Sequence, residues 1–380
     1  TPSVFGISTW LDYRDSDAVE RGYYQVSLGL EYLTDWFEIR SNVYVPDIED
    51  GRRELPNRFA GNSLLIERAE IALAGVDVEV GTVLPAVGGM QGRVALGYYH
   101  FDDPDVDAVT GWRVRGELAA HENLTAEAIA SNDDVFGSTF VVRLTLHSLQ
   151  DLIHPLGNLQ YPAIHSLRDG EGAHITNNVT DRLGERVRRN RFIVTGVDDG
   201  EAAVNPTTML PYEFLFVSAG AAGDGAFETP YGTISEAMSD GRSGEAITYT
   251  PFGGTYAEDV VMTDGSKLFS NAVDHTLATQ SDAVTLPFSG VGQQSSLASS
   301  ITGSVTVASN SELDGFTIDD GVLGTAVSSV VIERNRIGNL GGDGIFLSSL
   351  SNAAGSEIQI TDNSILAGVN DGISLGGTAV

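Results

Sequence analysis

The stretch RGYYQVSLGLEYLTDWFEIRSNVYVP, residues 21–46, decides the fold class. Apolar and polar residues alternate through it, in two runs separated by a tight turn at 33–36. On the first run, one face carries Val26, Leu28, Leu30 and Tyr32, and the other carries Gln25, Ser27, Gly29 and Glu31. Strands of about ten residues with one apolar and one polar face are typical of a transmembrane β-barrel. The strands of soluble sandwiches usually run to only about 5–6 residues.

The composition fits an all-β chain and argues against several other classes. The 380 residues include 44 glycines and no cysteine, so neither disulfides nor thiolate metal sites are possible. No run of about 18 apolar residues is present to form a membrane helix. The formal net charge of −31 argues against nucleic acid as a partner.

Charge and pattern divide the chain into three segments. Residues 1–191 carry a net charge of −12 and residues 192–380 one of −19, and the basic cluster RLGERVRRNR lies just before this change. We therefore expect a barrel domain at 1–148, a linker at 149–219 and a third domain at 220–380. A short helix is predicted at 181–190 within the linker.

Eight strands are predicted in the first segment, at about 4–14, 22–34, 36–46, 67–84, 92–102, 111–121, 124–132 and 138–147. Their polar face carries charges of both signs. Because a charged group facing lipid costs about 2–4 kcal/mol near the membrane midplane, this face must be the lumen. Tight turns alternate with longer loops, and the longer loops lie at 46–67, 101–111 and 132–137. The long loops are therefore expected outside, and the last strand is expected to end on the periplasmic side.

The third segment contains an internal repeat. VIERNRI at 331–337, followed by DGIFL, recurs as QITDNSI at 359–365, followed by DGISL, so each matched pair is 28 residues apart. One coil cannot bury its own apolar face, so we expect the coils to stack into a solenoid. The matched Asn335 and Asn363 can then form a hydrogen-bonded ladder.

These motifs carry two resemblances. Residues 1–148 resemble the barrel domain of inverse autotransporters, the group containing intimin and invasin, through SLGLEYLTDWFEIRSNVYVP, GVDVEVGTVLP and SNDDVFGSTFVVRLTL. Residues 220–380 resemble right-handed parallel β-helices of the pectate-lyase-like type, through GDGAFETPYGTISEAM, GEAITYTPFGGTY and the DGI coils. The family barrel has about twelve strands, so the first resemblance implies about four further N-terminal strands, an export signal and a longer passenger.

The resemblance to inverse autotransporters implies a function in type V secretion. It implies an anchor in the lipid of the bacterial outer membrane, placed there by the barrel-assembly machinery, that exports a passenger and displays it on the cell surface. The passenger is expected to act as an adhesin or a structural element, through self-association or a cell-surface ligand. In this family the linker passes back through the pore.

A linker in the pore is expected to pair with luminal carboxylates. The candidate residues are Arg182, Arg186, Arg188, Arg189 and Arg191 on the linker, and Glu38, Asp77, Glu79 and Glu117 on the strands. The alternative is that these arginines form the exposed face of a helix.

No catalytic constellation is evident in the sequence, and no cofactor is predicted. Asp102, Asp103, Asp105 and Asp107 have the alternate spacing of a calcium loop but lack its later ligands and its glycine, so a solvated external loop is favoured. Three alternatives stay open: a surface β-helix that binds or cleaves polysaccharide, a porin-like channel, and a surface lattice of packed β-helices.

Overall fold

The chain is all-β, as the alternation predicts, and it divides into two compact units. The computed structural model describes residues 2–15, 22–47, 51–85, 90–121, 124–146, 179, 182, 187–338, 342–350, 356–366 and 370–377. The first unit comprises Thr1–Leu55 and Ala69–Asp198, and the second comprises Pro56–Arg68 and Asp199–Val380. The division differs from the predicted segments, because residues 56–68 and 199–219 both belong to the second unit.

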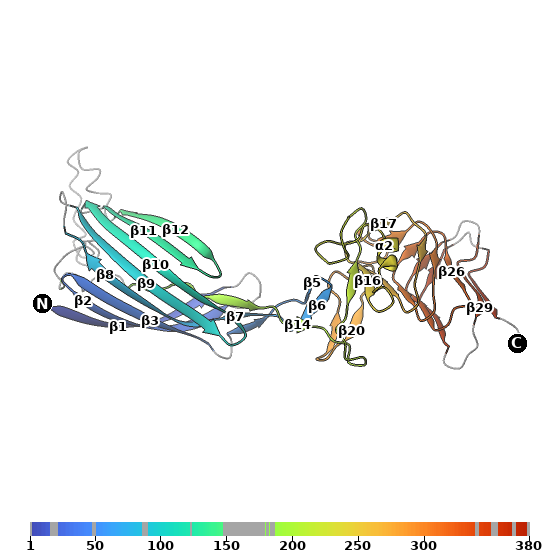
Figure 1. The fold of residues 1–380 in the computed structure, drawn as a ribbon, viewed down its shortest axis with the longest axis horizontal. Helices are drawn as coiled ribbons and strands as arrows, with labels where there is room; N and C mark the ends of the chain where they lie inside the picture. Colours follow the sequence, from blue (N-terminus) through green and yellow to red (C-terminus); the bar gives the residue numbers. More distant parts are fainter. Residues whose placement is uncertain are drawn as a thin grey trace, which may run out of the picture. The chain divides into compact units, whose positions relative to one another are not determined.

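The first unit is built on an antiparallel sheet of eight strands, which Figure 1 shows in blue to green. In sheet order the strands are β1 (Ser3–Arg14), β2 (Tyr23–Thr34), β3 (Phe37–Pro46), β8 (Ala74–Val83), β9 (Gln91–Asp103), β10 (Val106–His121), β11 (Leu124–Asp133) and β12 (Gly137–Leu146). Seven of the eight predicted strands are thus confirmed, and neighbours along this order pair with one another. The strand predicted at 67–84 is divided: residues 74–83 form β8, whereas residues 69–72 belong to a separate small sheet.

The two faces of this sheet have the reverse of the usual distribution of polarity. On β2, Ser27 is 1% exposed, whereas its apolar neighbour Leu28 is 42% exposed. The same alternation appears on β3, where Arg40 is buried and Ile39 is exposed. A soluble sheet buries its apolar face. Here the charged face is covered and the apolar face is open.

Two stretches predicted as long loops contain strands instead. Residues 46–67 include β4 (Arg52–Glu54), β5 (Arg58–Ala60) and β6 (Ser63–Ile66). Within 101–111, β9 continues to Asp103 and β10 begins at Val106, so only two residues separate them. The extended β9–β10 hairpin is held by buried apolar side chains, Phe101 and Val109, which the acidic composition of this stretch conceals.

Two small antiparallel sheets use the connection between β3 and β8. In the first unit, β7 (Ala69–Ala72) lies between β4 and β13 (Thr195–Asp198). In the second unit, β6 lies between β5 and β14 (Glu201–Ala202). The connection between β3 and β8 therefore contributes strands to both units.

The second unit consists mainly of three parallel sheets. The first is β15 (Phe214–Phe216), β16 (Ile247–Thr250), β19 (Lys267–Ser270), β24 (Glu312–Asp314), β27 (Val330–Glu333) and β30 (Ile358–Thr361). The second is β17 (Gly254–Tyr256), β22 (Ser299–Ile301), β25 (Thr317–Ile318), β28 (Arg336–Ile337) and β31 (Ser364–Ile365). The third is β18 (Val260–Val261), β23 (Val305–Thr306), β26 (Val322–Thr325), β29 (Ile345–Leu350) and β32 (Ile373–Gly377). A separate hairpin is formed by β20 (Thr276–Ala278) and β21 (Ala283–Thr285).

From β16 onward, and apart from the β20–β21 hairpin, successive strands of the chain visit the three sheets in turn, so each circuit adds one strand to each sheet. The 28-residue repeat is confirmed, because residues 28 apart in sequence pair on adjacent parallel strands. Val331 pairs with Gln359, Ile337 with Ile365 and Ile345 with Ile373. The predicted asparagine ladder is also present, because Asn335 Nδ2 donates to Asn363 Oδ1 at 3.1 Å.

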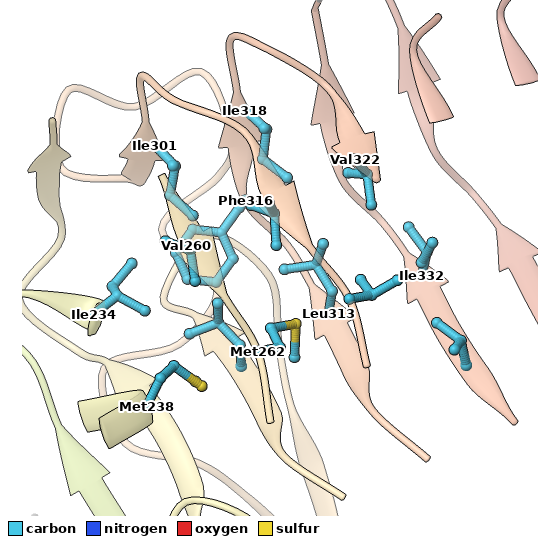
Figure 2. Packing of buried hydrophobic residues seen from close by; sticks show 14 of the residues in the cluster. Ile234, Met238, Val260, Met262, Ile301, Leu313, Phe316, Ile318, Val322 and Ile332 are labelled. Carbon is cyan, nitrogen blue, oxygen red and sulfur yellow. The ribbon is translucent and has the colours of Figure 1, made fainter. Parts of the chain in front are cut away.

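The core of the second unit lies between the three parallel sheets. Figure 2 shows Ile301, Phe316, Ile318 and Leu313 pointing into a common interior. The helix α2 (Ile234–Ser239) covers it with Ile234, Ala237 and Met238, and a capping box between Thr233 and Glu236 fixes the start of this helix.

Replacement of Phe316 tests this packing. Phe316 is fully buried, so Phe316→Ala is expected to lower the free energy of unfolding of the second unit by about 3–5 kcal/mol through lost burial and a residual cavity. Urea unfolding followed by hydrogen exchange of residues 299–337 measures the change. Val261→Ala, at an exposed position, is the control and should change it by less than about 0.5 kcal/mol. Equal effects of the two variants would contradict the assignment of the core.

Candidate functional site

A segment that lies far along the chain follows the polar face of the eight-stranded sheet. Its described residues are 179, 182 and 187–194. Val179 and Arg182 lie beside the β2–β3 turn, where the Val179 backbone N–H donates to Asp35 Oδ1 at 3.0 Å. At the other end of the strands, the Leu73 N–H donates to the Val194 carbonyl at 2.9 Å. This segment therefore passes along the strands from one end of the sheet to the other.

Arg182 holds the segment at the first of these ends. Its side chain is 1% exposed. Its Nη1 donates to the Thr34 carbonyl at 3.2 Å, and its Nη2 is ion-paired with Glu38. A buried guanidinium needs such a carboxylate, because removing an unpaired charge from water is costly.

Arg188 and Arg189 hold the middle of the segment on opposite edges of the sheet. Arg188 is ion-paired with Glu117 on β10, and its Nη1 lies 2.8 Å from Glu127 Oε1 on β11. Arg189 makes a two-pronged pair with Asp12 on β1, at 2.6 and 2.7 Å. Bidentate pairs of this kind are among the stronger charge-assisted hydrogen bonds.

The helix predicted at 181–190 is wrong for residues 187–190, which carry no helix. The contacts explain this conformation. The neighbours Arg188 and Arg189 point to opposite sides, as successive side chains do in an extended chain. A ten-residue helix would also advance only about 15 Å, less than half the length of the strands. The prediction for residues 181 and 183–186, which include Arg186, lies outside the described residues.

A hydrogen-bonded chain continues toward the far end of the strands. The Asn190 backbone N–H donates to the Tyr44 hydroxyl at 2.7 Å, and that hydroxyl donates to Asp77 Oδ2 at 2.7 Å. Asn42 Nδ2 donates both to Asp77 Oδ1 at 2.7 Å and to the Arg188 carbonyl at 3.0 Å. Asp77 thus reaches the segment through Tyr44 and Asn42.

Arginines of the strands themselves fill the space between the carboxylates. Arg40 Nη2 lies 3.2 Å from Glu38 Oε2. Arg115 Nη2 lies 3.1 Å from Glu38 Oε1, and its Nη1 lies 2.7 Å from Glu117 Oε1. Arg93 Nη1 is 3.7 Å from Glu38 and 3.6 Å from Glu117. Glu38 is therefore shared between arginines of the sheet and of the segment.

We call these residues the charged network. Its strand carboxylates are Asp12, Glu31, Glu38, Asp77, Glu79, Glu117 and Glu127, and its strand arginines are Arg40, Arg93, Arg113, Arg115 and Arg143. The carboxylates outnumber the strand arginines, and the three arginines of the segment bring the two signs close to balance. Removing one partner from a buried pair costs about 3–5 kcal/mol, because it leaves the other charge uncompensated.

Several predicted site residues lie elsewhere. Glu79, on β8, pairs with Arg113 and Arg115 of β10, two strands away in the sheet. Arg191 is exposed. Asp12 and Glu127 were missed as partners of the segment, although the alternation that places Glu38 and Glu117 on the polar face applies to them as well.

The four aspartates proposed as a calcium loop lie on the β9–β10 hairpin. Asp102 and Asp103 are in β9 and Asp107 is in β10. Asp105 lies in the turn between them, where its carboxylate is 2.9 Å from Arg52 Nη1.

The second unit contains a different cluster of carboxylates. Oxygens of Glu312, Asp314 and Glu333 all lie within 4.8 Å of one another on the adjacent strands β24 and β27. Cationic side chains already reach this group. Arg334 Nε donates to Asp314 at 3.0 Å, and Lys267 Nζ lies 2.8 Å from Glu312. These two cations offset part of the negative charge of the three carboxylates.

Asp314 is the buried member of this cluster. His275 Nδ1 lies 3.2 Å from its Oδ2. Burial alone would raise the pKa of Asp314, but the hydrogen bonds from His275 and Arg334 outweigh burial and hold that pKa below its ordinary value. Burial and the Asp314 carboxylate raise the pKa of the neighbouring Glu333.

Comparison with known proteins adds little to this description. No protein-family model and no curated protein matches the chain. A solved structure described as "Unveiling the Mechanism Behind the in-meso Crystallization of Membrane Proteins" is similar at 13% identity, over 51% of this chain and 74% of its own, with a TM-score of 0.35. Similarity of that degree carries no argument about fold or function. Within the described residues, no helix is long and apolar enough to cross a membrane.

The depressed pKa of Asp314 predicts a loss of stability in acid. Because the pKa of Asp314 is lower in the folded than in the unfolded state, its contribution is complete above the unfolded value of about 4 and declines as the pH falls below it. Asp314→Asn should therefore be less stable at pH 7 by about 1.5–3 kcal/mol and should show a flatter stability profile below pH 4. Urea titrations at pH 3–7 measure both. A wild-type profile that is equally flat would contradict this role.

Proposed function

We propose that the protein is a membrane-anchored display protein of the inverse autotransporter kind. The eight-stranded sheet forms part of a β-barrel in an outer membrane, and the parallel sheets form a β-helix carried on the cell surface. The observation that carries the proposal is the reversed polarity of the eight-stranded sheet, whose charged face is buried and whose apolar face is open.

The exposed face of the sheet supports contact with lipid. Apolar side chains occupy the middle of the strands, for example Leu28 and Val78. Aromatic side chains gather toward the strand ends, with Tyr13 packed against Tyr24 at one end and Trp36 at the other. Outer-membrane barrels carry such an apolar band between two aromatic girdles. Exposing this apolar surface to water costs free energy, whereas contact with hydrocarbon does not.

The path of the segment 179–194 supports display rather than conduction. It begins beside the β2–β3 turn and leaves at the opposite end of the strands, next to the connection between β3 and β8. A chain that follows the interior of a barrel in this way carries the residues after it to the other side of the membrane. The ion pairs of Arg182, Arg188 and Arg189 would also obstruct the open pore of a porin.

The passenger is proposed to act as a structural or adhesive element. Its strands repeat in register over successive circuits, which gives an extended surface of uniform spacing. Its one close group of carboxylates in the described residues is already in contact with Arg334, Lys267 and the imidazole of His275. These contacts favour a scaffold over a hydrolase or lyase.

Leu28→Arg tests the contact with lipid. Leu28 lies in the middle of β2 on the open face, so the substitution should destabilise the folded protein in phospholipid vesicles by about 2–4 kcal/mol. Heat-dependent mobility in gels and urea unfolding in vesicles measure the loss. Val261→Arg, an exposed apolar position of the second unit, should have little effect. If Leu28→Arg were as stable as the wild type, this face would not contact lipid.

The pair of Asp12 with Arg189 tests the path of the segment. Arg189→Glu places two carboxylates together and should sharply reduce the fraction of protein whose residues 220–380 are exposed to antibody or protease on intact cells. The double variant Asp12→Arg with Arg189→Glu restores the pair with its signs exchanged and should recover display.

Arg189→Lys is the matched control, because it keeps the charge and should retain most of the display. Folded barrel in the membrane fraction is quantified in every variant. Normal display by Arg189→Glu, or failure of the reciprocal variant with the barrel intact, would rule out this path.

A further inference from the structure

The connection between β3 and β8 supplies a hairpin, β5–β6, to the second unit. We propose that this hairpin is the folding template of the parallel sheets: it forms first and provides the edge on which their first strand, β15, is laid. The hairpin and its contacts all lie within the second unit. The inference therefore does not depend on the membrane location proposed above.

The hairpin provides the centre of an aromatic cluster. Phe59 is 3% exposed. Its ring centroid lies 5.1 Å from that of Phe214 and 4.7 Å from that of Phe216, both on β15. It also lies 5.8 Å from Tyr249 on β16 and 5.5 Å from Phe227. One side chain of the hairpin thus contacts the first two strands of the first parallel sheet.

The hairpin also satisfies backbone groups at the start of the second unit. The Ala203 N–H donates to the Leu64 carbonyl at 2.8 Å, and the Phe214 N–H donates to the Asn62 carbonyl at 2.9 Å. The side-chain amide of Asn62 donates to the carbonyls of Phe214 at 2.7 Å and Gly225 at 2.9 Å. These contacts satisfy the backbone of Phe214, at the beginning of the first edge of the sheet, which would otherwise present unpaired groups. Further along the same edge, the backbone of Phe216 pairs with Gly225 and Tyr231.

Charge fixes where the chain enters the unit. Arg58 Nη2 lies 2.7 Å from Asp199 Oδ1, and Arg68 Nη2 lies 3.4 Å from the same oxygen. Arg58 and Arg68 stand at the two ends of the hairpin. Asp199, the first residue after the segment leaves the first unit, is therefore held between them.

The order of folding follows from sequence separation. The hairpin closes locally, with Gly61 at a φ of 56° in its turn, and hairpins form within about 1–10 μs. Parallel neighbours such as β15 and β16 are separated by a long crossover, whose closure entropy is lost before the pairing is gained. An existing edge with a buried aromatic side chain lowers that first barrier, and each later circuit needs only its predecessor.

A passive cap would make the same contacts but would form them last. The two roles differ in kinetics. A substitution in a template slows folding, whereas a substitution in a late cap speeds unfolding.

The test uses the full chain in detergent micelles, with the second unit unfolded and refolded in urea. All three tryptophans, Trp10, Trp36 and Trp112, lie in the first unit, so their emission reports whether that unit stays folded. Pulsed hydrogen exchange of residues 299–337 follows the parallel sheets. The variants are Phe59→Leu, Phe59→Ala and Asn62→Ala, and Leu313→Ala in the distant part of the core is the matched control.

For Phe59→Ala, we expect refolding of the parallel sheets to slow by about the same factor as the equilibrium constant falls, at least about tenfold, with an unchanged unfolding rate. Leu313→Ala should mainly speed unfolding. Phe59→Leu and Asn62→Ala remove fewer contacts than Phe59→Ala and should slow refolding by smaller factors. If Phe59→Ala does not fold, these two variants provide the test. Unchanged refolding rates with faster unfolding in the hairpin variants would overturn the proposal and leave the hairpin as a cap.

Discussion

The buried carboxylates of the eight-stranded sheet impose the constraint on which the first unit depends. A carboxylate removed from water needs a cation and hydrogen bonds, and the strand arginines do not supply enough of them. The deficit is met by Arg182, Arg188 and Arg189, which come from a segment 61 to 177 residues away in sequence from their carboxylate partners. Charge balance thus determines both where this segment lies and in which direction it runs.

The second unit depends on apolar burial between sheets rather than on charge. Its circuits pair residue by residue, and each one buries side chains against the circuit before it. Only the first circuit has no predecessor. The hairpin from the β3–β8 connection packs against the first circuit through Phe59 and Asn62. In both units a distant segment of the chain thus covers a surface that would otherwise be left open, by ion pairs in the first unit and mainly by apolar packing in the second.

Much of the fold could be predicted from the sequence. Alternation with period two located the eight strands, and the 28-residue repeat predicted the register of the last circuits, because both depend on local side-chain periodicity. The strands inside 46–67 could not be predicted, since each has only three or four residues, too few to show a clear alternation. One of them, β6, also pairs with β14, far away in sequence. The helix expected at 181–190 is absent at residues 187–190 for a related reason. Arg188 and Arg189 are held extended there by carboxylates on different strands. The sign of each charge and the face of the sheet on which it lies could be predicted from the sequence. Which arginine pairs with which carboxylate could be learned only from the structure.

The hairpin within the β3–β8 connection has a consequence for modularity. A gene fragment beginning after Asp198 would encode nearly all of the second unit, yet it would leave Phe59 and Asn62 behind with the sheet that it abandoned. Recombination at that boundary would therefore join new parallel sheets to a first contact that does not fit them. Duplication of later circuits meets no such barrier, because each later circuit packs against another circuit like itself. Related proteins should therefore diverge in the number of circuits far more readily than in the first circuit.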